Sequence, residues 1–281
     1  MVSENTAYRK ACFVAKRAIT PKIGQLTASA SATLRNIQAI DNLLNEMRRQ
    51  FPSSEPYEWA LNHVSKAIIK QAETETTAKI ETCYPLGRVV IGLVGRGHDK
   101  LSDILIARLN KKAFWLTGYY PPRGTLSIEE HRKVLGYTVT GETSTQYNLR
   151  MSGLTALYAA ICATDPATPP QGPVQPSSIP TMFRPAAIWR LLVLLLRQPF
   201  ISLAPTPLLL QTILQVAGPS LLRIYGKQMN KFLACLLQQG IRQNKGEWSE
   251  ENKSGLARLE IWLEEWEKGK VEELEGFRPS P

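Results

Sequence analysis

Apolar residues recur at spacings of three and four along most of this 281-residue chain, and this spacing most narrows the possible folds. Between residues 28 and 50 one face of a helix would carry Leu34, Ile37, Ile40, Leu44 and Met47. Between residues 147 and 163 a second stripe comprises Leu154, Leu157, Tyr158 and Ile161. The sequence shows no sustained period-two alternation and no Asn-Gly or Asp-Gly hairpin turn. We therefore predict an all-α fold.

The same spacing, with proline and capping signals, predicts further helices over 57–81, 99–112, 127–136, 186–197, 207–216, 219–238 and 254–268. Residues 8–25 are expected to form a short helix and a loop. Residues 83–98 are expected to be a turn region, with a glycine-rich connector at 92–100. That connector lacks the Lys-Ser or Lys-Thr that follows the last glycine of a phosphate-binding loop.

Prolines divide the chain near its middle. Residues 164–185 contain Pro166, Pro169, Pro170, Pro173, Pro176, Pro180 and Pro185. This density disfavours a helix and predicts an extended surface loop or linker. We expect a single domain over 1–281, with an N-terminal half (1–163), the proline-rich loop and a C-terminal half (186–275).

Positive charge is unevenly distributed. The formal net charge is +10, of which residues 1–246 contribute +15 and residues 247–275 contribute −6. A basic body suggests a polyanionic partner, such as nucleic acid, an acidic protein surface or a phosphorylated small molecule. A role in solubility alone is the alternative.

The segment 101–122 concentrates this charge. Leu101, Ile104 and Leu105 lie on one helical face, and Arg108, Lys111 and Lys112 continue it before the turn Tyr119-Tyr120-Pro121-Pro122. The simpler explanation is that cations in a last turn complement the helix dipole. Further basic groups are Lys16, Arg17 and Lys22, then Lys66 and Lys70. If helices 57–81 and 99–112 pack side by side, these cations would surround one shallow pocket for several phosphates. Otherwise they are unrelated solvated faces.

Nothing in the sequence indicates catalysis or a metal site. The histidines, His63, His98 and His131, are isolated, and the cysteines, Cys12, Cys83, Cys162 and Cys235, lack metal spacing and are expected to be free thiols. The first ten residues hold no apolar signal segment, and the run 191–196 is too short to cross a bilayer. We expect a nuclear or cytosolic protein that is not an enzyme.

Several ordered motifs carry a family resemblance. They are Lys70-Gln71-Ala72-Glu73, Leu105–Lys112 with Tyr119-Tyr120-Pro121, Leu135-Gly136-Tyr137, Arg150-Met151-Ser152-Gly153, Leu157-Tyr158-Ala159-Ala160, Tyr225-Gly226-Lys227-Gln228 and Ala257-Arg258-Leu259. With them the chain resembles the C-terminal domain of the GLE-one family of mRNA-export mediators at the nuclear pore, in a fungal-like form. The block from Arg150 to Ala160 is the most specific.

The resemblance implies an irregular helical scaffold, akin to HEAT-like proteins and to the MIF4G-like middle domain of eIF-four-G. It implies binding to the DEAD-box helicase of mRNA export, stimulation of its ATPase cycle, and inositol hexakisphosphate as a tether between the two proteins. It also implies an FG-repeat nucleoporin bound by the C-terminal half, at the cytoplasmic face of the pore. The residues similar to the family's inositol-phosphate ligands are Lys66, Lys70, Arg108, Lys111 and Lys112, with Lys16 and Lys22.

Two other functions stay open. A direct RNA-binding adaptor would use the basic body together with aromatic rings that stack on bases. Tyr119, Tyr120 and Trp115 are candidates, although Trp115 is more typical of a core residue. A passive docking scaffold of the pore would have the same sequence features.

Overall fold

The computed structural model describes residues 6–138, 141–168, 170–172, 174–243, 245 and 247–280. Within these ranges the secondary structure is helical, without a β-strand, which confirms the all-α prediction. The α-helices are α1 (Thr6–Gly24), α2 (Ala30–Gln50), α3 (Glu55–Ala78), α4 (Cys83–Val94), α5 (Lys100–Lys112), α6 (Ile128–Val134), α7 (Ser144–Ala163), α8 (Pro185–Leu195), α9 (Thr206–Tyr225), α10 (Lys227–Cys235) and α11 (Lys253–Glu267).

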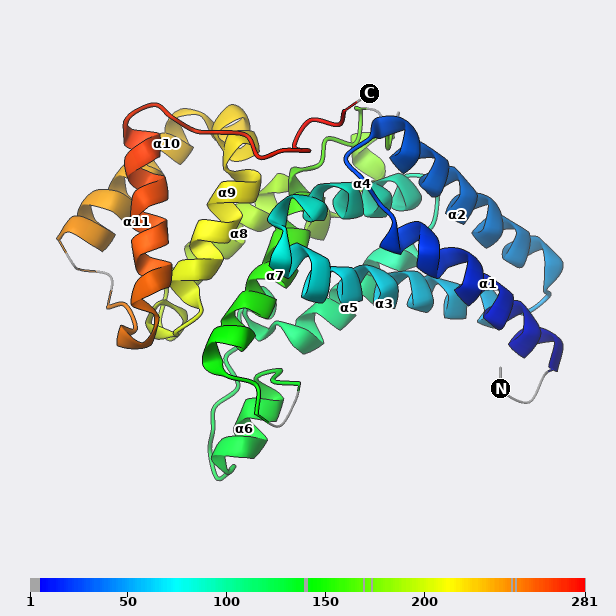
Figure 1. Ribbon diagram of the computed structural model, residues 1–281, viewed down its shortest axis with the longest axis horizontal. Coiled ribbons are helices and arrows are strands. Elements are labelled where there is room, and N and C mark those ends of the chain that lie inside the picture. Colours follow the sequence, from blue (N-terminus) through cyan, green and yellow to red (C-terminus); the bar gives the residue numbers. More distant parts are fainter. Residues whose placement is uncertain are drawn as a thin grey trace.

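Helix α7 is the central element of the arrangement. It packs against α3 and α4 on one side and against α9 on the other, and α11 covers α9 (Figure 1). One continuous cluster of buried side chains extends from Ala15 in α1 to Leu263 in α11. The short helix α6 projects from this body as an arm (Figure 1). The described part of the chain contains no helix with the length and apolar character that a membrane span requires.

The expectation of a turn region over 83–98 was wrong, because Cys83–Val94 forms helix α4. All twelve of its residues are buried, so the helix has no exposed polar face that would mark it as a surface helix. Its glycines permit close packing: a Cβ atom at Gly87 would lie 3.0 Å from the Ala160 backbone in α7. Gly97, with a φ of 87°, then makes the turn into α5.

Two prolines lie inside helices that were expected to be shorter. Pro21 lies within α1, so residues 6–24 form one helix and not a short helix with a loop. Pro219 lies within α9, which runs unbroken where two separate helices were expected. Proline removes one backbone hydrogen bond, but α9 is packed between α7 and α11, and this burial outweighs the local loss. The real break is at Gly226, and α10 then continues into the π-helical segment Leu236–Arg242.

The proline-rich loop is not simply a surface linker. Its described residues form no α-helix before α8 begins at Pro185, as expected, and contain the 3₁₀ turns Pro176–Ser178 and Thr181–Phe183. Val174, Ile179 and Phe183, however, are buried in the core. Pro169 and Pro173 lie outside the described residues.

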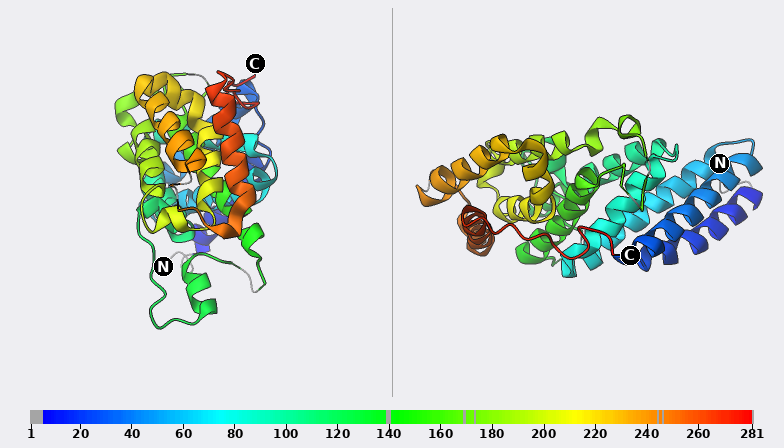
Figure 2. Two further views of the ribbon diagram at one scale, coloured as in Figure 1. Left: turned by 90° about the vertical axis from the view of Figure 1, so that its left-hand side faces the viewer. Right: turned by 90° about the horizontal axis from the view of Figure 1, so that it is seen from above.

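Residues 268–280, here named the C-terminal strap, run from α11 back across the body to the turn between α1 and α2 (Figures 1 and 2). Two backbone hydrogen bonds fix the far end, Ala30 N to Ser280 O at 2.7 Å and Ser280 N to Ala28 O at 3.1 Å. Nearer its middle, the Phe277 ring packs edge-on against Tyr84 of α4. The strap therefore joins the C-terminal helices to the N-terminal ones.

Candidate polyphosphate-binding site

The predicted cations lie on three helices, α1, α3 and α5, with α3 in the middle. Helix α1 contacts α3 through Thr20 Oγ1, which lies 2.9 Å from His63 Nε2. Helix α5 contacts α3 through Arg108, whose Nη2 donates to Asn62 Oδ1 at 2.9 Å. Helices α3 and α5 therefore pack side by side, which is the condition for their cations to lie near one another. We name the set Lys16, Lys22, Lys66, Lys70, Arg108, Lys111 and Lys112 the basic face.

His63 of α3 lies near a lysine of α1 and a lysine of its own helix. Its ring stacks on Trp59 of the same helix, with centroids 5.5 Å apart. Burial lowers the pKa of His63, and the positive charges of Lys16 and Lys66 lower it further. Both lysines and Lys70 are exposed, and Lys22 is half-buried. Cations from two helices thus act on one site without a described carboxylate partner.

The three cations of α5 differ from one another. Lys111 is exposed, whereas Arg108 is half-buried and its Nε atom is buried without a hydrogen-bond partner. Lys112 is already paired, because its Nζ lies 2.6 Å from Glu73 Oε1 on α3. In this structure the free positive charge of α5 therefore comes mainly from Lys111 and Arg108.

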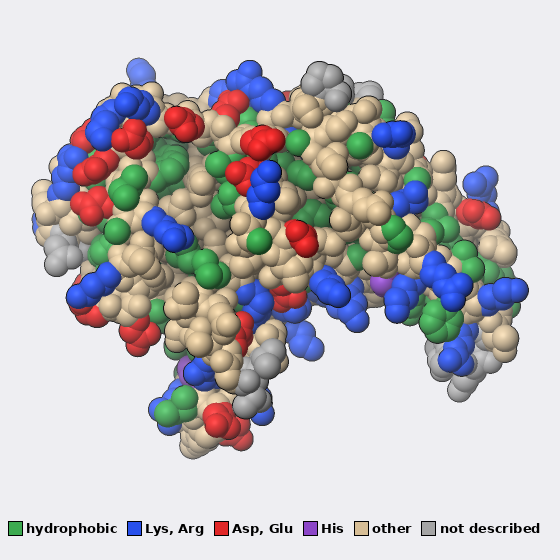
Figure 3. All heavy atoms as spheres, viewed as in Figure 1, with side chains coloured by type: hydrophobic (Ala, Val, Ile, Leu, Met, Phe, Trp, Pro, Cys, Tyr) green, Lys and Arg blue, Asp and Glu red, His purple; other side chains and the backbone are tan. Residues whose placement is uncertain are grey.

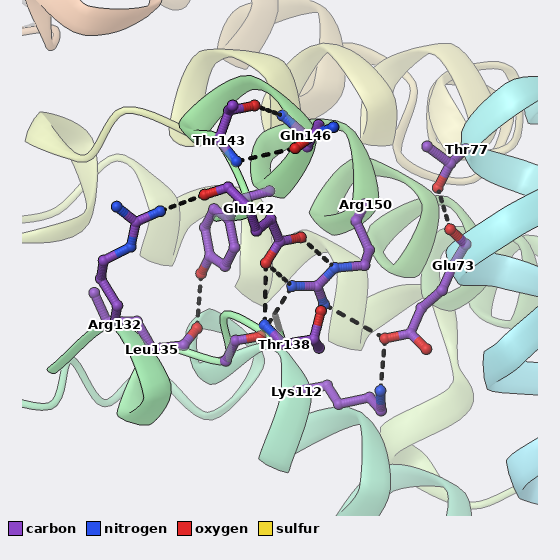
Figure 4. Close-up of polar contacts among 12 residues, drawn as sticks. Glu73, Thr77, Lys112, Arg132, Leu135, Thr138, Glu142, Thr143, Gln146 and Arg150 are labelled. Carbon is purple, nitrogen blue, oxygen red and sulfur yellow. Dashed lines mark hydrogen bonds and ion pairs between the residues drawn. The ribbon is translucent and has the colours of Figure 1, made fainter. Parts of the chain in front are cut away.

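Glu73 belongs to a partly buried ion cluster at the end of the basic face (Figure 4). Arg150 of α7 lies 3.4 Å from Glu73 through Nη1 and donates to both oxygens of Glu142, at 2.8 Å and 2.9 Å. Burial alone would raise the pKa of Glu142, but hydrogen bonds from Arg150 and from the Thr138 backbone amide hold it below its usual value. The cluster connects α3, α5 and α7 with the base of the arm.

Helix α6 of the arm begins with the Ser127–Glu130 capping box, which is present as expected. Its base is held by His131 Nε2, 2.8 Å from the Pro121 carbonyl oxygen, and by the stacked rings of Tyr137 and Tyr147, with centroids 3.8 Å apart. Tyr119 is 62% exposed at the start of the arm. Figure 3 shows Lys and Arg side chains gathered along the hollowed edge between the arm and the N-terminal helices.

Of the aromatic candidates for base stacking, Trp115 is a core residue, as expected, and Tyr120 is half-buried. His98 is fully buried, with Nε2 2.8 Å from Asp41 and Nδ1 3.0 Å from the Tyr57 hydroxyl. All four cysteines are free thiols. Across the described ranges no group of three or more His, Cys, Asp or Glu side chains is arranged to hold a metal ion.

Comparison with known proteins places this face in a family context. The mRNA export factor gle1 of Schizosaccharomyces pombe is 33% identical over 272 residues, which cover 95% of this chain and 53% of the relative. The mRNA export factor GLE1 of Saccharomyces cerevisiae is 29% identical over 269 residues, covering 94% of this chain and 47% of the relative. The chain spans about half the length of these curated relatives.

Solved structures give the same result. The fold matches a chain in the S. cerevisiae complex of a Dbp5 variant's C-terminal domain bound to Gle1 and IP6, with a TM-score of 0.83 and 26% identity over 99% of this chain and 90% of that chain. A second such complex, with a variant of Gle1, matches with a TM-score of 0.82 and 27% identity over the same shares of the two chains. The profile described as GLE1-like protein matches residues 1–237. The chain therefore belongs to the GLE1-like protein family.

Proposed function

We propose that this domain activates the ATPase of a DEAD-box helicase in mRNA export, at the cytoplasmic face of the nuclear pore, with inositol hexakisphosphate as a tether. The relatives are mRNA export factors, and the solved complexes pair Gle1 with Dbp5 and IP6. The observation that supports the proposal for this chain is that α1 and α5 both pack against α3, so that the cations of the basic face lie on neighbouring helices.

The basic face suits a ligand with several phosphate groups. Its unpaired cations repel one another, and a polyanion bound among them would remove this repulsion. Lysines act as mobile point charges, while Arg108 presents a planar fork. Its buried and unpartnered Nε atom marks a donor that a bound phosphate would satisfy. Because the contacts are ionic and mostly exposed, the affinity should fall as salt concentration rises.

The stimulation itself would be a population shift. The helical body would bind one arrangement of the two helicase lobes more tightly than the others, and so promote release of RNA and of spent nucleotide. The polyphosphate would contact this chain and basic groups of the helicase at the same time. The C-terminal half, α8 to α11, would dock an FG-repeat nucleoporin. Hydrolysis would be carried out by the helicase and not by this chain.

The test is a steady-state ATPase assay of the helicase with this domain, with and without inositol hexakisphosphate. A double substitution, Lys66→Gln with Lys111→Gln, should abolish the effect of the inositol phosphate. Replacement of a distant exposed arginine, Arg190→Gln, should leave it intact. Full stimulation by inositol hexakisphosphate in the double variant would exclude the basic face as its site.

Direct RNA binding is the second candidate, supported by the +15 charge of residues 1–246 and by the exposed ring of Tyr119. A gel shift without helicase at near-physiological salt separates the two. Tight binding that Tyr119→Ala weakens would favour the RNA adaptor. A domain that binds no RNA and leaves the helicase rate unchanged would be a passive scaffold.

A further inference from the structure

A pocket lies beneath the C-terminal strap, away from the basic face. Its volume is about 370 Å³, and its walls come from α4, α7, α9, the proline-rich loop and the strap. Its lining includes Tyr84, Arg88, Gln171, Ser220, Arg223 and Phe277. We name it the strap pocket. The strap crosses the upper side of Figure 1, whereas the basic side chains line the lower edge in Figure 3.

Arg88 is a buried cation at the edge of the strap pocket. Only 4% of the residue is exposed, although it lies on a helix that is otherwise almost entirely apolar. Its Nη2 donates to the carbonyl oxygens of Gly276 at 2.5 Å and Phe277 at 2.8 Å. Its Nη1 has no hydrogen-bond partner, and no described carboxylate lies within ion-pair distance. A buried donor without a partner is costly, and the positive charge of the guanidinium makes an anion the most favourable acceptor.

Gln171, on the wall formed by the proline-rich loop, has a buried hydrogen-bond acceptor without a donor. It is 3% exposed, and its Nε2 donates to the Asp165 backbone oxygen at 2.5 Å. Its Oε1 is buried and has no donor. Unsatisfied buried polar atoms are rare in folded proteins, and the strap pocket combines an unused donor with an unused acceptor. A ligand that carries both an anion and a hydroxyl group would satisfy them together.

The remaining walls favour a phosphate over a neutral ligand. Arg223 is exposed beside Phe277, with its guanidinium 5.6 Å from the ring centroid, and Ser220 adds a hydroxyl that makes only one long hydrogen bond, 3.4 Å, to Ala163 O. The one acidic group of the pocket, Asp165, is occupied by its own loop, since its two oxygens accept from Ala167 N and Thr168 Oγ1. The free groups are therefore net positive.

We propose that the strap pocket binds the phosphate monoester of a small polyol, as a site separate from the basic face. The phosphate oxygens would accept hydrogen bonds from Arg88, Arg223 and Ser220. A hydroxyl of the ligand would donate to Gln171 Oε1. A volume of about 370 Å³ exceeds that of a phosphate ion alone, and the rings of Tyr84 and Phe277 provide an apolar surface for the carbon skeleton.

The experiment is calorimetric titration of the full chain with glycerol phosphate, in the background of Lys66→Gln and Lys111→Gln so that the basic face does not contribute. Saturable binding to one site is expected. Arg223→Gln should weaken it about tenfold, the loss typical of one charged hydrogen bond, while the exposed Arg190→Gln should leave it unchanged. Ethyl phosphate, which carries no hydroxyl group, should bind more weakly than glycerol phosphate because Gln171 Oε1 stays unpaired.

Arg223 is chosen because it is exposed, so its replacement tests binding without loss of the fold. Arg88→Met provides a second test if its circular dichroism spectrum matches the parent, and it should remove binding. Absence of saturable binding in the parent chain, or equal affinity for the parent and Arg223→Gln, would overturn the proposal. Neither outcome bears on the helicase assay, because the basic face is already substituted in this background.

Discussion

The ammonium group of Lys112 lies 2.6 Å from the carboxylate of Glu73, so two adjacent lysines of α5 have different roles. Glu73 is only 15% exposed at its side chain and also receives Arg150, so it holds Lys112 within a structural cluster. Lys111 points to solvent with no such partner among the described residues. A bound polyphosphate would contact Lys111 as an unpaired charge, whereas the charge of Lys112 is partly neutralised by Glu73.

Separate substitution of these lysines should therefore give different results. Lys111→Gln should weaken inositol hexakisphosphate binding about tenfold and leave the free energy of unfolding unchanged, since it removes a free charge. Lys112→Gln should weaken binding less and should also lower the free energy of unfolding by about 0.5–1 kcal/mol, the usual range for a partly exposed ion pair. Calorimetric titration and urea denaturation measure the two effects. Identical profiles for both variants would contradict this distinction.

The pKa of His63 should respond to a bound polyanion. Burial holds it below the ordinary value, and Lys16 and Lys66 lower it further. Inositol hexakisphosphate on the basic face would offset the two lysine charges, so the pKa of His63 should rise. By linkage, the ligand should bind more tightly as the pH falls through this pKa. Titration of the imidazole NMR signals with and without ligand tests this, and the signals of His131, on the arm, serve as a reference.

Acid should weaken the Glu142–Arg150 pair, because the pKa of Glu142 is lower in the folded chain than in the unfolded one. The contribution of this pair is complete above the ordinary carboxyl pKa near 4.5 and is lost as the pH falls through the lower folded value. Arg150→Met should cost about 3 kcal/mol at neutral pH, because Glu142 would stay buried without its partner. The difference from the parent chain should shrink as the pH falls through the ordinary carboxyl pKa towards the lower value that Glu142 has in the folded parent. A difference independent of pH would contradict this assignment.

Gly153 marks the closest approach of α7 to α3. A Cβ atom at this position would lie 2.3 Å from the Ala72 carbonyl oxygen and 2.5 Å from Thr77 Oγ1. Gly153→Ala should therefore lower the free energy of unfolding by about 3 kcal/mol, because the backbone of α3 must shift. Gly240→Ala is the control, since its nearest atom is the mobile end of Leu236 at 3.2 Å, and its stability should be unchanged or slightly higher. Thermal unfolding of both variants tests the comparison.

The sequence block from Arg150 to Gly153 now has a physical explanation. Arg150 donates to Glu142 and lies near Glu73, and Met151 is fully buried. Ser152 Oγ lies 2.7 Å from Thr212 Oγ1 of α9. Gly153 has no side chain, and this allows α3 to pack closely against α7. Four consecutive residues thus make contacts in four directions around α7. Few other residue types would satisfy all four requirements at the start of the block from Arg150 to Ala160.

Helices with one polar face were predictable, and those without one were not. The stripes of α2 and α5 repeat every three or four residues, so their positions and the cations on α5 followed from spacing alone. Helix α4 is buried on every side and contains proline and glycine, so its sequence pattern favours a turn region. A lone arginine, Arg88, in that apolar segment was the only sequence signal that a polar contact lay inside the core.

Partnerships over long sequence separations were not predictable either. The pairing of Lys112 with Glu73 spans 39 residues, and the hydrogen bond from Arg88 to Gly276 spans 188. Both depend on how helices pack, which no local spacing encodes. Charge placement along one helix was therefore readable from the sequence, but the fraction of that charge left free for a ligand was not.

Removal of the strap should destabilise the N-terminal helices. A chain ending after Lys270 would lose the Phe277 contact with Tyr84 and both carbonyl acceptors of Arg88. Its free energy of unfolding should fall by about 3 kcal/mol, the cost of leaving a buried charged donor unsatisfied together with lost apolar contact. Denaturation of both chains measures this loss. Equal stability would show that the strap contributes no net stabilisation.

The strap also ties α11 to the turn between α1 and α2. Its far end is bonded at Ala28 and Ala30, its near end follows α11, and it crosses only part of the length of the molecule (Figures 1 and 2). A force that pulls α11 away from that turn would load these two backbone hydrogen bonds. The distance between the two is therefore held before any partner binds, and a partner that contacts both must match it.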